Sequence, residues 1–311
     1  MVLPKRVKRD GGPFVESLGI VCGLAAAVCH SASYIFSRLF VIERKHAVVR
    51  LLVASHLIMG VISLLLLPLV WTSDLPPVRN YFLPLLGASF FYLVGQAGLF
   101  YLVRGTDSSR VAPLLGFKIV IIAFVVVLFM GQHLSGKQWL AVALSVTATL
   151  ALSQTGGGLP VRAMLWLAVT CTGYSLSDLS ITALVKALAP LSPLHASIVG
   201  VCFSYILCGV AGMILLPRAG GTQVLADWKY AVPFAVVWLL AMVFLFACFG
   251  LVGPVYGNIL QSTRGIISIV AGAYLAKLGM EHLEKRVSPW ILIRRIASAI
   301  LMCVAIWLFK G

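Results

Sequence analysis

The stretch APLLGFKIVIIAFVVVLFMG, residues 112–131, is apolar along its whole length except for Lys118. A run of this length can cross the hydrocarbon core of a bilayer as a single helix. A lysine well inside such a helix is unfavourable, because its insertion into lipid costs about 2.5–3.5 kcal/mol. The stretch therefore predicts a membrane-spanning helix that keeps a buried cation, and raises the question of what that cation does.

The whole chain shares this apolar character. Of its 311 residues, 61% are hydrophobic and 11% are charged, and the mean hydropathy is +1.04. Apolar runs of about 18 residues or more recur along the sequence, as they do in spanning helices, without the alternation typical of membrane barrel strands. The sequence predicts an all-α membrane protein. It contains no soluble basic domain that would bind nucleic acid.

Ten transmembrane helices are expected, separated by short turn-forming segments such as TGGGLP and PRAGGT. Glycine, proline and small polar residues at these points are typical of chain reversals. No connecting loop is long enough to fold separately, so the function is expected inside the helix bundle. The expected spans are residues 17–42, 48–71, 80–103, 110–131, 137–154, 162–189, 192–217, 229–252, 255–277 and 289–309.

The two halves of the chain are similar in sequence. An apolar helix is followed by GQHL at residues 131–134 and by MEHL at residues 280–283, then by a tryptophan and a further apolar helix. The first helices of the halves also correspond, because HSASY at 30–34 aligns with YSLSD at 174–178 and brings two pairs of serines into register. This self-similarity indicates an internal repeat.

Five helices per repeat is an odd number, so the second repeat should enter the membrane in the opposite sense. Inverted-topology repeats of this kind are common in secondary transporters. The expected organisation is a basic N-terminal segment (1–16), a first five-helix repeat (17–154), a linker (155–161) and a second five-helix repeat (162–311).

Each half carries a cation at the same depth. Sliding the second half onto the first by 146 residues places Arg264 on Lys118, and both lie about 12 Å from the start of their helices at the rise of an α-helix. Asp178 is the only acid within an expected span, so the two cations leave an excess positive charge that a bound anion would neutralise. The alternative is that Asp178 pairs with a cation to serve the fold.

Polar and aromatic side chains on neighbouring spans would complete this site. Taken singly, a serine here is more typical of helix packing than of ligand binding, and His30 is as consistent with packing as with a ligand contact. No catalytic, nucleotide-binding or metal-ligating motif stands out in the sequence, so no enzyme activity, cofactor or metal is expected. The candidate substrate-binding residues are Lys118, Arg264, Asp178, His30, Ser33, Tyr34, Tyr92, Gln96, Tyr174, Ser177, Asn258, Gln261 and Ser262.

The arrangement of spans as five plus five, the small polar residues of each first helix, and the endings GQHLSGKQW and MEHLEKRVSPW resemble the drug/metabolite transporter superfamily, of the EamA type. In that family each half closes with a Gly-Glu-x-Leu-Ser turn. Here Gln132 replaces the acid in the first half, and Met280-Glu281 departs from the pattern in the second. The resemblance covers nearly the whole chain and implies a secondary transporter, expected to be an exporter, that works by alternating access.

Lys118 and Arg264 also resemble the cations of plastid phosphate translocators, distant members of that superfamily that grip phosphate with a lysine in the fourth helix and a Lys-Arg pair in the ninth. Thr263 stands where the additional lysine would be. The expected substrate is a small anionic or amphipathic metabolite. The alternative is a translocase for a phosphate-bearing lipid or lipid-linked headgroup.

The expected setting is the lipid bilayer of a bacterial cytoplasmic membrane, with the protein as a monomer or homodimer. Its orientation is left open by two opposing indications. The resemblance places the N-terminus inside, whereas the count of lysines and arginines near the span ends favours the N-terminus outside.

Overall fold

The computed structural model describes residues 13–44, 48–106, 111, 114–131, 133–153, 160–279 and 289–310. Across these residues the regular structure is helical. Among them, five helices are long and apolar enough to cross a membrane, which confirms an all-helical membrane protein. They are Phe14–Glu43, Val48–Val70, Phe82–Gly105, Pro193–Leu215 and Gly221–Val252.

The helices of the first half follow the predicted ranges to within a few residues, because turn-forming residues end them. Gly131, for example, ends its helix with a φ of 61°, a left-handed conformation that glycine adopts easily. The elements are α1 (Pro13–Glu43), α2 (Val48–Val70), η1 (Val78–Asn80), α3 (Phe82–Gly105), η2 (Leu115–Phe117), α5 (Lys118–Met130) and α6 (Gly136–Ser153).

The second half contains α7 (Val161–Ala187), α8 (Pro193–Leu215), α9 (Gly221–Val252), α10 (Pro254–Ser262), α11 (Arg264–Lys277) and α12 (Pro289–Lys310). Several predicted features lie outside the described residues. These are most of the N-terminal segment (1–12), Gln132 of the first turn motif, most of the linker (155–159), and the second turn motif at 280–283.

The predicted start of the eighth span was wrong, and with it the expectation that Asp178 is the only acid in a span. The helix α9 begins at Gly221, two turns before the apolar run, so it includes Asp227. Asp227 is buried, and its carboxylate accepts a hydrogen bond of 2.8 Å from Arg50 and lies 3.5 Å from Nε of Arg44. These partners allow an acid in a helix turn that hydropathy alone would assign to a loop.

The predicted ninth span is not a continuous helix. It is interrupted at Thr263, between α10 and α11, where the hydroxyl groups of Ser262 and Thr263 donate to backbone carbonyls three residues earlier. Such side-chain bonds compete with the helical ladder. The fourth span is also irregular, because the 3₁₀ turn η2 precedes α5. Lys118 and Arg264 therefore each begin a helix immediately after an interruption.

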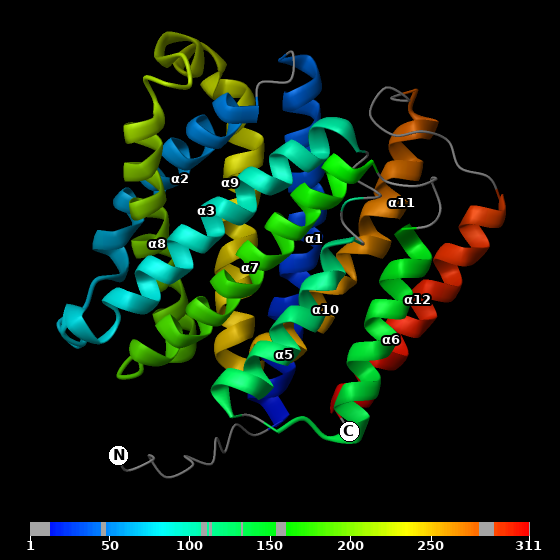
Figure 1. Ribbon diagram of the computed structural model, residues 1–311. Helices are drawn as coiled ribbons and strands as arrows, with labels where there is room; N and C mark the ends of the chain where they lie inside the picture. The colour runs from blue at the N-terminus through cyan, green and yellow to red at the C-terminus, as the bar shows by residue number, and fades with distance from the viewer. Residues whose placement is uncertain are drawn as a thin grey trace.

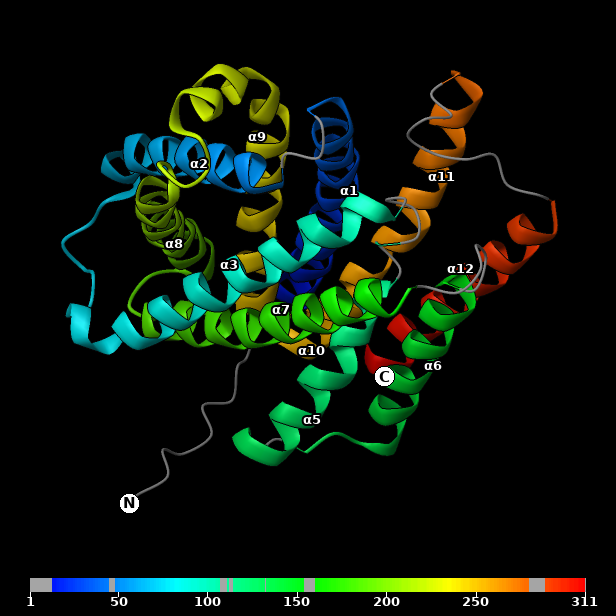
Figure 2. The same cartoon turned by 45° about the horizontal axis from the view of Figure 1, so that its top comes forward.

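The helices pack in pairs that join distant parts of the chain. The most extensive pairings are α3 with α7, α1 with α9, α2 with α8, and α6 with α12. Figure 1 shows α3 and α7 running side by side across the front, and the space-filling view of the same face shows their surfaces in contact. After a turn of the molecule, α6 and α12 remain together at one edge while α2 and α8 lie at the other (Figure 2).

The pairing of α3 with α7 depends on glycines that let the two backbones meet. A Cβ added at Gly173 would lie 2.7 Å from the backbone nitrogen of Gly95 and 2.9 Å from the carbonyl oxygen of Phe91. Close approach through small residues is the usual way in which helices associate in membranes. This crossing therefore has no room for a larger side chain.

We expect Gly173→Ala to destabilise the protein by about 1–3 kcal/mol, the usual range for overpacking. The added methyl group meets backbone atoms, which cannot move aside as a side chain can. Thermal melts of the purified protein in detergent measure the effect. The matched control is Gly136→Ala, because nothing lies within 4 Å of its Cβ, and it should stay within about 0.5 kcal/mol of the parent. Equal melts for the two variants would contradict the close crossing.

Candidate functional site

A buried cavity forms where α1, α3, α5, α7, α9 and α11 meet, and most of the predicted site residues line it. The remaining candidates, Ser33, Gln96, Asn258, Gln261 and Ser262, are buried around it without lining it. The predicted residues that line the cavity are His30, Tyr34, Tyr92, Lys118, Tyr174, Ser177, Asp178 and Arg264.

Sequence reasoning missed three lining residues, Trp238, Met242 and Leu245, all on α9. This part of α9 is apolar on every side, so no polar residue marked the face that meets the cavity. A usable signal was nevertheless present. The slide of 146 residues that places Arg264 on Lys118 also places Trp238 on Tyr92.

Lys118 forms a buried ion pair with Asp178. Nζ of Lys118 lies 2.8 Å from Oδ2 of Asp178, and the two side chains are 4% and 5% exposed. The amide of Asn258 donates to the same carboxylate oxygen at 2.9 Å. Asp178 is thus held by donors from both interrupted spans, and it neutralises the lysine.

Arg264 has no such partner. It is only 3% exposed, makes no ion pair with the residues that the structure describes, and leaves its Nε without a hydrogen bond to them. Its guanidinium carbon lies 6.0 Å from the ring centre of Tyr34, a distance at which a cation is attracted to an aromatic face. The cavity therefore keeps a positive charge that no described carboxylate balances.

The same serine contact occurs once in each half. The hydroxyl of Ser31 lies 2.8 Å from a carbonyl oxygen one turn earlier in α1 and 3.1 Å from the carbonyl oxygen of Arg264. The hydroxyl of Ser175 lies 2.7 Å from the corresponding carbonyl oxygen in α7 and 3.3 Å from that of Lys118. Each serine therefore ties the first helix of its half to a cation of the other half, at the point where the cation's span is interrupted.

The side chain that faces the buried cation differs between the two halves. The alignment of HSASY with YSLSD that pairs the serines also places Tyr34 opposite Asp178. Asp178 binds Lys118 through a carboxylate, whereas Tyr34 presents an aromatic ring to Arg264. Among the described residues, the positive charge that is left in the cavity reflects this difference between two positions that align in the sequence.

Aromatic rings enclose the rest of the cavity around Trp238. The centre of its ring lies 4.7 Å from that of His30, 6.1 Å from those of Tyr34 and Tyr92, and 6.4 Å from that of Tyr174. The space left among these side chains has room for about one water molecule. A larger ligand would enter only after the rings or helices move.

Hydrogen bonds behind the wall fix two of these rings. Nδ1 of His56 donates to the carbonyl oxygen of Leu52 at 2.6 Å, so its Nε2 is the acceptor for the hydroxyl of Tyr92 at 3.1 Å. Nε1 of Trp238 donates to the hydroxyl of Tyr205 at 2.8 Å. The wall is therefore held in place by polar contacts of α2 and α8.

His30 presents an unused nitrogen at the cavity. Nε2 of Gln261 donates to the carbonyl oxygen of Gly23 at 2.8 Å, which turns the amide oxygen of Gln261 toward Nδ1 of His30 at 2.9 Å. Nδ1 is therefore the donor, and Nε2 of the neutral ring is an acceptor. It is buried without a partner in the described part of the chain, so it could receive a hydrogen bond from a ligand.

The hydroxyl groups of the predicted serines already have hydrogen-bond partners in the backbone. The hydroxyls of Ser33, Ser177 and Ser262 donate to backbone carbonyl oxygens, and the hydroxyl of Tyr174 donates to the amide oxygen of Gln96. These contacts fit the packing role that the sequence favoured for single serines. Among the described residues that line the cavity, Arg264 and His30 keep a buried nitrogen without a hydrogen-bond partner, and both could therefore contact a ligand.

We expect Lys118→Ala to lower the free energy of unfolding by about 3–5 kcal/mol, because it leaves Asp178 buried without its cation. The double variant Lys118→Ala with Asp178→Ala should recover most of that loss. Thermal melts of both single variants and the double variant measure the coupling.

Arg50→Ala is the matched control for removing one cation. Arg50 is partly exposed, and Asp227 would retain Arg44, so this change should cost much less than Lys118→Ala. If the effects of the two changes at Lys118 and Asp178 were simply additive, the pair would contribute nothing to stability.

Comparison with known proteins agrees with this architecture. No curated protein matches the sequence. A solved structure titled "Crystal structure of protein" has a TM-score of 0.57 at 14% identity, over 92% of this chain and 97% of its own, which shows a shared fold. The model of the EamA-like transporter family matches residues 17–154. Over these residues the match confirms the resemblance seen in the sequence and identifies an EamA-like region of the drug/metabolite transporter superfamily, in a chain whose long apolar helices indicate an integral membrane protein.

Proposed function

We propose that this transporter moves a small organic anion, with export as its direction, and that Arg264 binds the anionic group. The observation that carries the proposal is a deeply buried arginine without a carboxylate partner among the described residues, beside a lysine whose charge Asp178 already neutralises. An uncompensated buried charge is unfavourable, and a bound anion would remove that cost. The planar guanidinium suits carboxylate or phosphate groups.

The neighbours of Arg264 narrow the kind of substrate. Nε2 of His30 is an acceptor without a partner in the described part of the chain, so the site favours a substrate that carries a hydroxyl or N–H group near its anionic group. Trp238 and the surrounding rings would cover its apolar part. The family match contains no indication of lipid transport, so the lipid-translocase alternative gains no support from it.

We further propose ten spans in two inverted repeats, 17–154 and 162–311, that rock around the cavity. The family match covers the same residues as the first predicted repeat. The duplicated serine contacts and the interruptions before Lys118 and Arg264 are what two equivalent halves would produce. Interrupted helices beside a central site are common in transporters with inverted repeats.

The closed cavity supports alternating access, because a site with room for about one water molecule must open before it binds a metabolite. The setting in this proposal is the cytoplasmic membrane of a bacterium.

We expect Tyr34→Asp to cancel anion binding, because it would give Arg264 the carboxylate that Lys118 already has. Arg264→Gln should weaken binding of benzoate and inorganic phosphate by about thirtyfold or more, the usual consequence of losing one partner of a buried charge pair. Calorimetric titration of the purified protein and flux into proteoliposomes measure both variants. Tyr34→Phe is the matched control, because it keeps the ring and adds no charge.

Binding of an organic cation tests the sign of the excess charge in the cavity. A cavity with an excess positive charge should bind tetraphenylphosphonium poorly. Saturable uptake of this cation that survives Asp178→Asn would contradict the anionic proposal. So would unchanged anion binding in Arg264→Gln, provided that the melt shows the variant to be folded.

A further inference from the structure

A second cavity, of about 370 Å³, lies where α3 ends and α7 begins. It shares no lining residue with the central site. The charged side chains in its wall are Arg104 and Arg162, which are both exposed. Neither forms an ion pair with any residue in the described ranges. The cavity is therefore a concentration of positive charge at the end of the helix bundle.

The rest of the wall combines stacked rings with free backbone donors. The rings of Tyr101 and Trp166 stack with centres 4.6 Å apart and planes 15° from parallel, and both rings are half-buried. Pro160 caps α7 without a side-chain hydrogen bond, and the amide of Ala163 already donates to its carbonyl oxygen at 2.9 Å, so the amides of Val161 and Arg162 are the ones left for an anion in the described part of the chain. On the α3 side, Arg38 donates to the carbonyl oxygen of Thr106 at 2.6 Å and so holds the end of that helix.

An apolar strip leads away from this cavity along α7. Val161, Leu165 and Val169 are exposed, and their spacing of four residues places them on the same face of the helix. In a membrane protein such a face lies against acyl chains. The basic cavity and the apolar strip therefore adjoin on one helix, with the cavity at its end.

We propose that this cavity binds the anionic headgroup of a membrane phospholipid, whose acyl chains lie along Val161, Leu165 and Val169. Arg104 and Arg162 supply the charge and the hydrogen-bond donors that a phosphate group accepts. Tyrosine and tryptophan are characteristic of the headgroup level of a bilayer. The adjoining apolar strip distinguishes a lipid from a free anion, which would make no use of it.

Such a lipid would brace the crossing of α3 and α7. These helices carry Tyr92 on one side and Tyr174 and Asp178 on the other, all of which line the central cavity. Headgroup binding at their shared end would hold that wall of the substrate site together. The inference does not depend on the identity or charge of the transported substrate.

The test uses the full chain purified in an uncharged detergent and titrated with dihexanoyl phosphatidylglycerol while its melting temperature is followed. We expect a saturable rise in the melting temperature with phosphatidylglycerol and little or none with dihexanoyl phosphatidylcholine. The double variant Arg104→Gln with Arg162→Gln should bind the anionic lipid about twenty-fivefold more weakly, since each arginine near an anionic headgroup contributes about fivefold.

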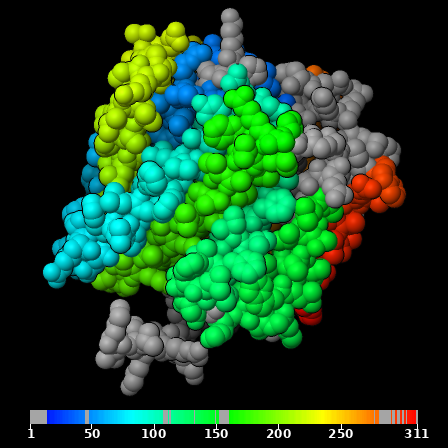
Figure 3. Space-filling view, viewed as in Figure 1, coloured from blue at the N-terminus to red at the C-terminus, as the bar shows by residue number. Residues whose placement is uncertain are grey.

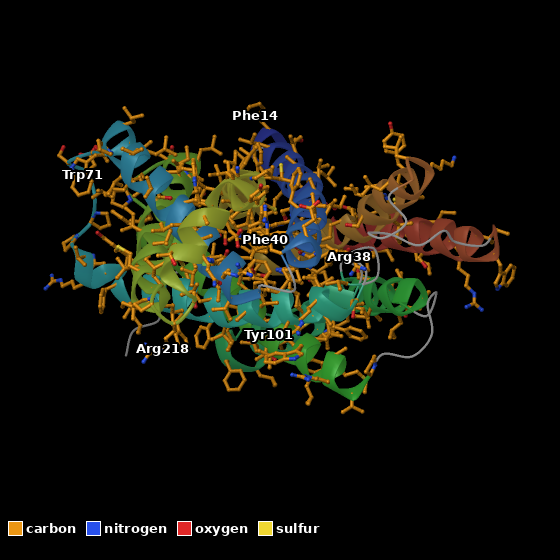
Figure 4. All side chains as sticks on the ribbon, turned by 90° about the horizontal axis from the view of Figure 1, so that it is seen from above. Phe14, Arg38, Phe40, Trp71, Tyr101 and Arg218 are labelled. Atoms are coloured by element: carbon orange, nitrogen blue, oxygen red, sulfur yellow. The ribbon has the colours of Figure 1, made fainter. Side chains whose placement is uncertain are left out.

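Arg218→Gln is the matched control, because Arg218 is an exposed arginine outside this cavity. Figure 4 labels Arg218, in the turn between α8 and α9, and Tyr101, which lines the cavity from α3. The control should keep the parent's response to phosphatidylglycerol. Both cavity arginines are exposed, so the double variant should fold, and its melt without lipid checks this directly.

Three outcomes would overturn the inference. The first is an equal response of the double variant and the parent protein to phosphatidylglycerol. The second is an equal response of the parent to phosphatidylcholine. The third is that inorganic phosphate at matched concentration reproduces the whole rise, which would assign the cavity to a soluble anion. None of these outcomes bears on benzoate binding at Arg264, so the two proposals fail independently.

Discussion

Two buried cations line the cavity beside a single carboxylate, which pairs with only one of them among the described residues, and the rest of the site follows from that imbalance. Asp178 is satisfied by Lys118 and by the amide of Asn258, while Arg264 rests against the ring of Tyr34. A buried ion pair roughly offsets its own desolvation and adds little net stability. Its consequence is therefore one of charge, because the pair neutralises the lysine and leaves the arginine as the cation of the cavity that no described carboxylate balances.

The interrupted helices explain how such a site fits inside an apolar bundle. At each interruption a serine from the first helix of the other half lies within hydrogen-bond distance of the backbone, at the carbonyl oxygen of Arg264 or of Lys118. The same interruptions set the cations at the cavity. Rings from α3, α7 and α9 then exclude all but about one water molecule, which lowers the local dielectric and strengthens the interaction of the arginine with any anion.

Much of the fold could be predicted because its signals are local. An apolar run and the turn residues around it predicted α2 at 48–71, and the structure has it at Val48–Val70. Local signals failed where a partner lay elsewhere in the chain. Asp227 lies buried within α9, where its carboxylate meets Arg44, just after α1, and Arg50 of α2. The residues that flank Asp227 in the sequence give no sign of these arginine partners.

The sequence by itself determined that Lys118 and Arg264 would be buried, because hydropathy belongs to the chain alone. It also predicted that the halves correspond. Only the tertiary structure decided which cation Asp178 would neutralise, because that choice depends on distances between helices that are far apart in the sequence. For the same reason Trp238, on a helix that is apolar on every side, entered the site only when packing turned it toward the cavity.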